Sequence, residues 1–291
     1  ISPSCEALLG YTAHEILQHD PYFFFHPDDR EYVRRESHLP TLAGKSVPIT
    51  YRARHKEGHY IWFETLTNPI LDGAGNVVHI QTTSRDVSDR IQAQNQLKHD
   101  ALHDQLTQLP NRTLLTERLE LAIHRAQQLE SFQFAVLVLD LDRFKVINDS
   151  LGHLVGDRLL VAVARQIQSV LRPTDVAARL GGDEFVILLE DIKDEQTPIH
   201  VAEQIFAALQ TPLTLEDRDI YITTSIGIVL SHARYTTAAD LIRDADIAMY
   251  QAKHHGKARF AIFDTDMHAS ALTRLHLEHD LRQAISQDQF V

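Results

Sequence analysis

Hydrophobic and polar positions divide the first third of the chain into short helical stretches and β-prone runs. Three such runs cover residues 47–55, 60–71 and 77–85, and turns that contain glycine separate them. Helical stretches precede these runs, at residues 12–17 and after His26, where a proline and two acids favour a helix start. The pattern predicts an N-terminal unit of mixed helices and strands.

From about residue 100 the pattern changes to amphipathic helices that alternate with strongly apolar strands. Six consecutive apolar residues at 134–139 predict a strand that is buried on both faces and central in a sheet. The same spacing rules predict helices at 111–128, 153–171, 197–209 and 241–252, and strands at 176–180, 185–189, 220–230 and 259–263. The order βαββαβ predicts an α/β (α+β) sandwich of the ferredoxin-like type.

A polar, glycine-free stretch connects the two halves. Residues 87–103 contain no proline and have high helix propensity, so we expect a linker helix over residues 90–103. Its apolar positions form an imperfect stripe, which argues against a stable isolated coiled coil. Two roles stay open for this helix: a weakly pairing transmitter between domains and a plain spacer.

The most informative stretch is residues 179–189, where two glycines are followed at once by two carboxylates. Glycines between β-prone runs predict a tight hairpin with Asp183 and Glu184 at its tip. An ordinary turn would have the same local pattern. A second acidic stretch favours a functional interpretation, because Asp140 ends the buried strand at a rigid edge and carboxylate oxygens suit Mg²⁺.

Composition and charge exclude several classes of protein. The chain has 291 residues, of which 44% are hydrophobic and 23% charged, so it suits a globular protein of two domains. A net charge of −12 without a basic cluster argues against a nucleic acid partner. A single cysteine, Cys5, fits a reducing compartment, and no apolar stretch is long enough to span a bilayer. We expect a cytoplasmic location and, since the chain begins at Ile1, a longer parent that could be attached to a membrane.

Several spaced motifs in the second half occur together in an order typical of one family. They are residues 104–112, 140–145, 148–153, 156–157, 181–185, 225–227 and 246–253. Together they resemble the GGDEF family of diguanylate cyclases. The resemblance implies an architecture related to nucleotidyl cyclases, which we assign to residues 104–266.

The resemblance implies an enzyme that condenses two GTP molecules into cyclic di-GMP and releases two pyrophosphates. One domain would hold half of the site, so a homodimer is implied. The implied cofactor is Mg²⁺ (or Mn²⁺), held by Asp140, the backbone carbonyl of Leu141, Asp183 and Glu184. Asp183 and Glu184 are also the implied catalytic residues, since Asp183 would help to deprotonate the attacking 3′-hydroxyl and Glu184 would support a second metal.

Further positions match residues that bind the nucleotide in the family. They are Phe144, Lys145, Asn148, His153, Asp157, Gly182, Lys253 and Lys257. Asn148 and Asp157 would read guanine. Lys253 and Lys257 would neutralise the β- and γ-phosphates from one helical face if the helix persists that far, and a solvated helix end is the alternative. Relatives often have asparagine where this chain has Ala258, which weakens the match there.

Arg172 and Asp175 match the Arg-x-x-Asp motif that forms the inhibitory product site in this family. There the arginine binds the guanine and phosphates of cyclic di-GMP. Interpreted locally, the two residues would end a helix at Pro173 and begin a turn. The resemblance favours feedback inhibition by the product.

The N-terminal half has motifs of its own, at residues 2–4, 9–11, 26–29 and 85–88. They resemble a PAS domain over residues 1–89, whose first strand is mostly missing from the sequence. PAS domains sense small molecules, light or oxygen, or dimerise, so the ligand is unknown. Two roles stay open for the histidines of this half: a haem ligand, and a solvated surface group, which is the more common role. These histidines are His14, His19, His26, His38, His55, His59 and His79.

Residues 267–291 have the pattern of a charged amphipathic helix. They resemble the linker that leads into an EAL phosphodiesterase domain, which we expect in the longer parent. The sequence as a whole predicts a diguanylate cyclase that is regulated by its PAS domain and by its product. The alternative is a catalytically silent GTP-binding module that controls a downstream EAL phosphodiesterase. The intact acids Asp140, Asp183 and Glu184 favour the enzyme.

Overall fold

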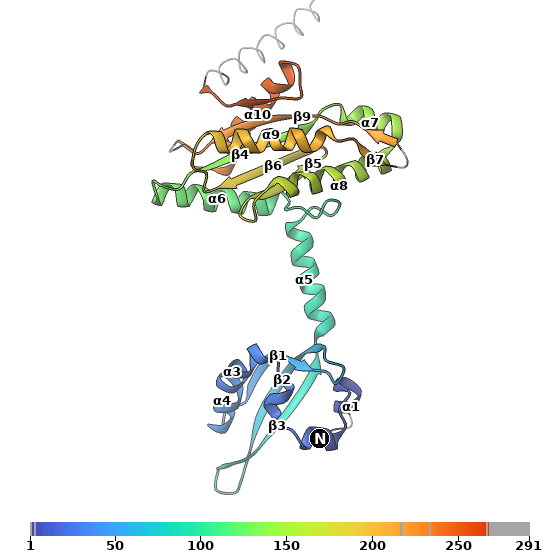
Figure 1. The fold of residues 1–291 in the computed structure, drawn as a ribbon. Coiled ribbons are helices and arrows are strands. Elements are labelled where there is room, and N and C mark those ends of the chain that lie inside the picture. Colours follow the sequence, from blue (N-terminus) through green and yellow to red (C-terminus); the bar gives the residue numbers. More distant parts are fainter. Residues whose placement is uncertain (1, 3, 216–217, 233, 266, 268–291) are drawn as a thin grey trace, which may run out of the picture. The chain divides into compact units, whose positions relative to one another are not determined.

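A computed structural model describes residues 2, 4–215, 218–232, 234–265 and 267 (Figure 1). Its internal contacts separate two units, residues 1–99 and 100–291. The helix expected at residues 267–291 lies outside the described residues apart from Met267. Within the described ranges, no helix is both long and apolar enough to cross a bilayer.

An antiparallel three-stranded sheet forms the centre of the N-terminal unit, in the order β1-β2-β3. Its strands are β1 (Val47–Arg54), β2 (Tyr60–Leu71) and β3 (Val77–Asp86), so the three predicted runs are confirmed as strands. Short helical segments precede the sheet: α1 (Ser4–Leu9), α2 (Ala13–Leu17), η1 (Pro21–Phe24), η2 (Pro27–Asp29), α3 (Arg30–Val33), the π-helical η3 (Arg34–His38) and α4 (Leu39–Leu42).

Alternate residues of β1 build the core of this unit. Ile49, Tyr51 and Ala53 point to one face of the sheet, where they pack against Phe24 and Val33 of the helical segments. Helix α5 (Ser88–Leu102) follows β3 at the stretch where the sequence predicts the linker helix. It contains no buried residue, which agrees with its imperfect apolar stripe.

A five-stranded sheet forms the centre of the second unit, in the order β10-β9-β4-β6-β5. Its strands are β4 (Phe134–Leu141), β5 (Val176–Gly181), β6 (Glu184–Glu190), β9 (Thr224–Leu230) and β10 (Phe260–Ile262). The central strand β4 pairs antiparallel with both β6 and β9, and β10 is parallel to β9. The predicted ferredoxin-like order is confirmed, with β10 added at one edge.

Helices cover both faces of this sheet, so β4 is buried on each side (Figure 1). Leu137 and Leu139 belong to a core cluster with α8 and α9, while Val136 and Val138 belong to a second cluster with α6 and α10. The helices are α6 (Arg112–Gln128), α7 (Phe144–Leu151), α8 (His153–Val170), α9 (Gln196–Gln210) and α10 (Ala238–His254).

One predicted strand is wrong in extent and in burial. The alternating isoleucines at residues 220–230 predict one half-buried strand, but Ile220 belongs to the small hairpin of β7 (Leu213–Leu215) and β8 (Arg218–Ile220). Strand β9 begins only at Thr224 and is almost wholly buried, because helices cover both faces of the sheet.

Candidate active site

Strands β4 and β6 bring three carboxylates to one end of the sheet. Asp140, next to last in β4, is in register with Glu184, the first residue of β6, and Asp183 precedes Glu184 in the turn. Gly181 and Gly182 form this turn with φ angles of 143° and 54°, which glycine adopts without strain. A Cβ at either glycine would meet no atom within 4 Å, so the hairpin tip is open on that side.

Burial and mutual repulsion shape the charge of this group. Burial raises the pKa of Asp140 above its usual range, and the charge of Asp183 adds to the effect. Burial likewise raises the pKa of Glu184, with contributions from the neighbouring acids. Lys253 of α10 opposes the rise at Asp140, because its Nζ lies 2.7 Å from Asp140 Oδ2. Clustered carboxylate oxygens that repel one another fit a hard divalent cation such as Mg²⁺, which would neutralise them.

The chain leaves this end of β4 directly into α7. Arg143, before the first turn, has a left-handed φ of 61°, and no described side chain caps the helix. The amide groups at Phe144 and Lys145 therefore begin a helix without a side-chain acceptor, an arrangement that favours an anion. Phe144 is buried and Lys145 is exposed.

Asn148 of α7 lies against Gly156 of α8. A Cβ at residue 156 would lie 1.8 Å from Asn148 Oδ1, so only glycine permits this side-chain position. Asn148 Oδ1 is buried and has no hydrogen-bond partner among the described residues. A buried oxygen without a donor is costly, so a ligand that donates a hydrogen bond would stabilise the site. His153 and Asp157 are exposed on the first turns of α8.

Lys253 and Lys257 are expected to share a helical face if the helix persists to residue 257, and this condition is not met. Helix α10 ends at His254, and Lys257 lies in the following turn with a φ of 63°. Lys257 N–H bonds to the carbonyl of Ala252 at 3.2 Å, which folds the turn back onto the end of the helix. Lys253 pairs with Asp140, whereas the exposed Lys257 side chain has no ion pair within the described part of the chain.

Residues 101–259 match the family of diguanylate cyclase GGDEF domains, and residues 1–84 match the PAS fold. The chain belongs to the GGDEF family of diguanylate cyclases. MucR of Pseudomonas aeruginosa, a bifunctional diguanylate cyclase/cyclic di-GMP phosphodiesterase, is 43% identical over 199 residues, which cover 68% of this chain and 29% of MucR. The chain spans less than half the length of the curated relatives it matches first.

Solved GGDEF structures are similar to the second unit. The GGDEF domain of TpbB (YfiN) from Pseudomonas aeruginosa is 40% identical with a TM-score of 0.56, covering 58% of this chain and 99% of that domain. The coiled coil and GGDEF domain of DgcB from Caulobacter crescentus, solved in complex with cyclic di-GMP, is 28% identical with a TM-score of 0.56. That match covers 60% of this chain and 93% of the DgcB chain.

Two acids that the sequence motifs include, but to which no role was assigned, contribute to the GGDEF site. Asp246 precedes Lys253 by seven residues on α10, so both residues lie on one face of the helix. This spacing in the sequence could have identified Asp246 as a residue of the site. The protein atoms packed around the Asp246 carboxylate raise its pKa, although the residue is exposed, and its charge raises the pKa of Glu184.

Asp142 is the second of these acids, and it is a buried anchor. Its carboxylate accepts hydrogen bonds from Thr223 Oγ1 at 2.7 Å, Ser225 Oγ at 2.8 Å and the Ala258 N–H at 3.1 Å. One side chain therefore connects the end of β4, strand β9 and the turn that contains Lys257. Alternate residues of a strand point to the same side, so the Asp-Leu-Asp alternation at residues 140–142 predicts that Asp142 points to the same side as Asp140.

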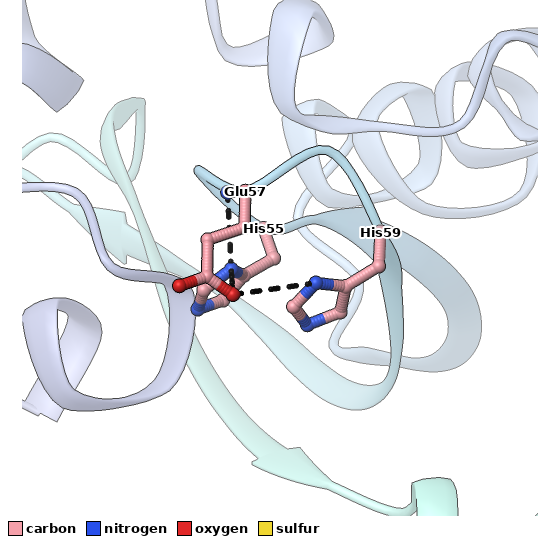
Figure 2. Close-up of side chains that lie close together, drawn as sticks. All are labelled: His55, Glu57 and His59. Atoms are coloured by element: carbon pink, nitrogen blue, oxygen red, sulfur yellow. Dashed lines mark hydrogen bonds and ion pairs between the residues drawn. The ribbon is translucent and has the colours of Figure 1, made fainter.

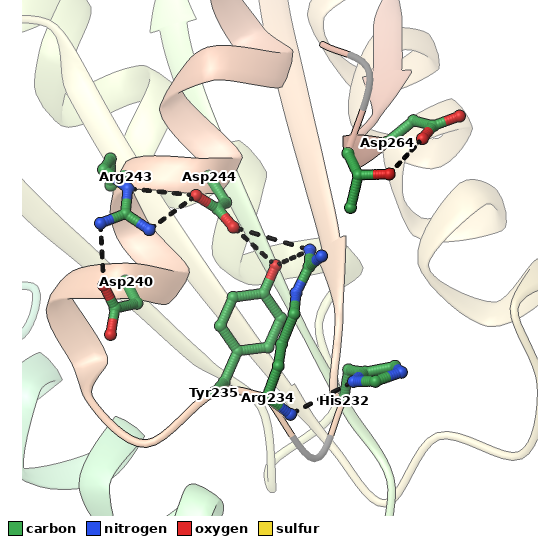
Figure 3. A network of polar contacts seen from close by, with 8 residues as sticks. His232, Arg234, Tyr235, Asp240, Arg243, Asp244 and Asp264 are labelled. Atoms are coloured by element: carbon green, nitrogen blue, oxygen red, sulfur yellow. Dashed lines mark hydrogen bonds and ion pairs between the residues drawn. The ribbon is translucent and has the colours of Figure 1, made fainter. Parts of the chain in front are cut away.

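A polar network holds the first turns of α10, the helix that also carries Asp246 (Figure 3). The buried Tyr235 hydroxyl donates to Asp244 Oδ2 at 3.0 Å and accepts from Arg234 Nη2 at 2.6 Å. Burial raises the pKa of Tyr235 to about 12, so the phenol stays protonated and can donate. The exposed Arg243 pairs with Asp240 and with the buried Asp244.

Arg172 and Asp175 lie together at one wall of a groove. Arg172 Nη2 is 2.8 Å from Asp175 Oδ1 and donates to the carbonyl of Glu190 at 2.9 Å. The Asp175 side chain is 1% exposed, whereas that of Arg172 is 49% exposed, so the guanidinium is fixed but accessible. The groove has a volume of about 640 Å³ and continues along α9 past Thr197 and His200.

The PAS unit contains a cavity of about 770 Å³ lined mainly by apolar side chains. Its polar groups include the Tyr22 hydroxyl, 2.7 Å from Nδ1 of His38, and the Tyr51 hydroxyl, which accepts from Thr65 Oγ1 at 3.2 Å. Burial raises the pKa of Tyr51 and lowers the pKa of His38, so both favour the neutral form. Among the histidines considered for haem, His38 lines this cavity.

Proposed function

We propose that this chain is a diguanylate cyclase that condenses two GTP molecules into cyclic di-GMP with release of two pyrophosphates. The observation that carries the proposal is the group of Asp140, Asp183 and Glu184 at the open hairpin tip, with Lys253 beside it. Carboxylates whose pKa is raised by burial and mutual repulsion are typical of sites built to hold a cation and a polyphosphate. Family membership supports the same activity.

The residues divide the chemistry between them. Asp183 takes the proton of the 3′-hydroxyl, whose oxygen then forms a bond to the α-phosphorus of the other GTP while the bond to pyrophosphate breaks. Asp140, the carbonyl of Leu141, Asp183 and Glu184 would hold Mg²⁺, which supplies positive charge to the phosphates. Lys253 and the amides at the start of α7 add to this electrostatic stabilisation.

Residues of α7 and α8 would recognise guanine. The unpartnered Asn148 Oδ1 needs a donor, and the N1–H and N2–H groups of guanine are donors. Asp157 directly follows Gly156, the residue against which Asn148 packs, and a carboxylate accepts from the same base edge. Each domain positions one nucleotide, so two copies of the chain must meet for the two GTP molecules to react.

Two forms of regulation are part of the proposal. The groove at Arg172 and Asp175 would take cyclic di-GMP as an inhibitor, since a fixed guanidinium suits guanine and phosphate. The cavity of the PAS unit would take a small neutral ligand, and α5 would transmit the signal. An EAL domain in a longer parent would degrade the product.

The experiment is incubation of the purified chain with GTP and Mg²⁺, followed by separation of the nucleotides over time. We expect cyclic di-GMP and pyrophosphate from the wild type and from Glu195→Ala, an exposed acid at the start of α9, but not from Asp183→Ala. Binding of GTP without product by the dimeric wild type would contradict the proposal and favour the regulatory module.

A further inference from the structure

The turn between β1 and β2 brings two imidazoles and a carboxylate together (Figure 2). His55, Glu57 and His59 each offer one ligand atom, and these atoms all lie within 4.8 Å of one another. The cluster belongs to the PAS unit, and neither the GGDEF site nor the cavity of about 770 Å³ includes any of the three residues.

The spacing of the ligand atoms is close to that of a metal site. Glu57 Oε2 lies 3.8 Å from His55 Nδ1 and 3.9 Å from His59 Nδ1. The two imidazole rings are stacked, with centroids 4.2 Å apart and planes inclined by 22°. Ligand atoms about 2.1 Å from a tetrahedral Zn²⁺ are about 3.4 Å apart, so the exposed His59 and Glu57 side chains must rotate to complete the geometry.

The backbone holds one ligand in place and leaves the other two adaptable. His55 N–H donates to the carbonyl of His59 at 2.8 Å, and Gly58, with a φ of 95°, closes the turn between them. The His55 side chain is 17% exposed and packs at Gly10, where a Cβ would lie 3.2 Å from Nε2. Glu57 and His59 are 79% and 56% exposed, so their side chains can rotate toward a cation.

The donor set determines which cation fits. Two imidazole nitrogens and one carboxylate oxygen suit Zn²⁺ and its neighbours Cu²⁺ and Ni²⁺, whereas Mg²⁺ and Ca²⁺ prefer oxygen alone. Figure 2 shows dashed lines from one Glu57 carboxylate oxygen to both imidazoles, so its negative charge would lie next to the cation. The cation must displace one interaction, the Glu57 N–H that donates to His55 Nδ1 at 3.2 Å.

We propose that His55, Glu57 and His59 form a binding site for a transition-metal dication of the Zn²⁺ type, with a fourth position left to water. The site is connected to α1, because the N–H of Lys56 donates to the carbonyl of Leu9 at 2.9 Å. Occupancy therefore stiffens both the β1–β2 turn and the end of α1, whose Leu8 and Leu9 line the cavity. The PAS unit is stabilised by the cation, since the unfolded chain has no such arrangement.

The test is a Zn²⁺ titration of the full 291-residue chain against a chromophoric chelator, in excess Mg²⁺ to saturate the carboxylates of the GGDEF site. We expect the wild type to bind one Zn²⁺ more tightly than Glu57→Gln and His59→Gln by about tenfold or more. The matched control is His79→Gln, an exposed histidine of β3 outside the cluster, which should bind as the wild type does.

Two readouts keep the outcome clear. Cu²⁺ bound to the wild type should show nitrogen hyperfine coupling that weakens in His59→Gln, and Zn²⁺ should raise the melting temperature of the wild type more than that of either variant. Because Glu57 and His59 are exposed, their replacement leaves the fold intact. Equal Zn²⁺ affinity in the wild type, Glu57→Gln and His59→Gln, or an equal loss in His79→Gln, would overturn the proposal.

Discussion

The Asp104 carboxylate and the Arg179 guanidinium form an ion pair in which Nη1 lies 3.0 Å from Oδ1 and 3.1 Å from Oδ2. The other two nitrogens of Arg179 donate to the carbonyl of Gly182, Nε at 3.0 Å and Nη2 at 2.7 Å. Thr107 donates twice to Asp104 from its amide and its hydroxyl. One arginine therefore connects the first residues of the GGDEF unit to the turn that carries Asp183.

We expect Asp104→Asn to lower both stability and turnover. The substitution leaves the Arg179 guanidinium, 10% exposed, without a counter-ion, so the free energy of unfolding should fall by about 2 kcal/mol. Turnover should fall severalfold, because Arg179 no longer holds the Gly182 carbonyl in one position. Denaturant unfolding and steady-state kinetics measure the two effects.

The control for this change is Glu31→Gln, which breaks the exposed pair with Arg34 in the other unit. An exposed pair contributes about 0.5 kcal/mol or less, so stability and turnover should both stay near those of the wild type. If Asp104→Asn loses stability but keeps full turnover, the arginine has no part in positioning the hairpin.

Gly156→Ala should weaken GTP binding through Asn148. The new Cβ would lie 1.8 Å from Asn148 Oδ1 and must displace that side chain from its present position. Loss of one hydrogen bond to guanine costs about 1.4 kcal/mol, so KM for GTP should rise about tenfold with a smaller change in kcat. Gly73→Ala is the matched control, because a Cβ at Gly73 meets no atom within 4 Å. An unchanged KM for Gly156→Ala would exclude Asn148 from guanine recognition.

Much of this architecture follows from periodicity and from the glycine-carboxylate turn. The apolar run at residues 134–139 predicts a central strand, and the structure confirms it, because complete burial requires cover on both faces. The strand end at Asp140 and the hairpin tip at Asp183 and Glu184 are local features of the sequence, whereas the expectation that the three acids meet comes from the resemblance to the GGDEF family.

Contacts between distant segments could not be predicted in the same way. The burial of Asp142 depends on Thr223 and Ser225, which reach it only through the pairing of β4 with β9. The course of the chain after His254 depends on the Ala258 amide meeting the same carboxylate, so the helix ends before Lys257. Likewise the cluster at the β1–β2 turn arises from side-chain rotamers, which the spacing His-x-Glu-x-His alone does not fix.

Arg172→Ala should relieve inhibition by cyclic di-GMP while leaving the uninhibited turnover unchanged. The guanidinium is the accessible cation of the groove, so its removal should raise the product concentration needed for half-inhibition by about tenfold or more. Progress curves with and without added cyclic di-GMP measure the effect. The buried Asp175 loses its partner, so Arg172→Lys, which keeps a cation, provides a second variant in which the fold is secure. Full inhibition in both variants would contradict the assignment.

Ala258→Asn should stabilise the protein. Ala258 has a left-handed φ of 48°, a conformation that asparagine adopts more readily than alanine. We expect the free energy of unfolding to rise by about 0.5 kcal/mol, and Ala258→Val, which is β-branched, to lower it. Denaturant midpoints compare the three proteins. If the turn owes its shape to the Asp142 contact alone, the three midpoints should be equal, since that contact uses the backbone amide and is common to all three.

Asp246→Asn should change the pH dependence of both stability and activity. Burial raises the pKa of Asp246 above its ordinary value of 3.8 in the folded state, so the folded protein binds more protons than the unfolded chain between these two pKa values. Stability therefore falls as pH rises through that window, and the variant, which has no such charge, should be more stable than the wild type at neutral pH and equal to it in acid.

Because Asp246 also raises the pKa of Glu184, removal of the Asp246 charge should shift the acid limb of kcat/KM to lower pH. Melting temperatures and pH-rate profiles test both effects, with Glu195→Gln as the exposed acidic control. Identical profiles for the wild type and Asp246→Asn would show that Asp246 does not act on the carboxylates of the hairpin.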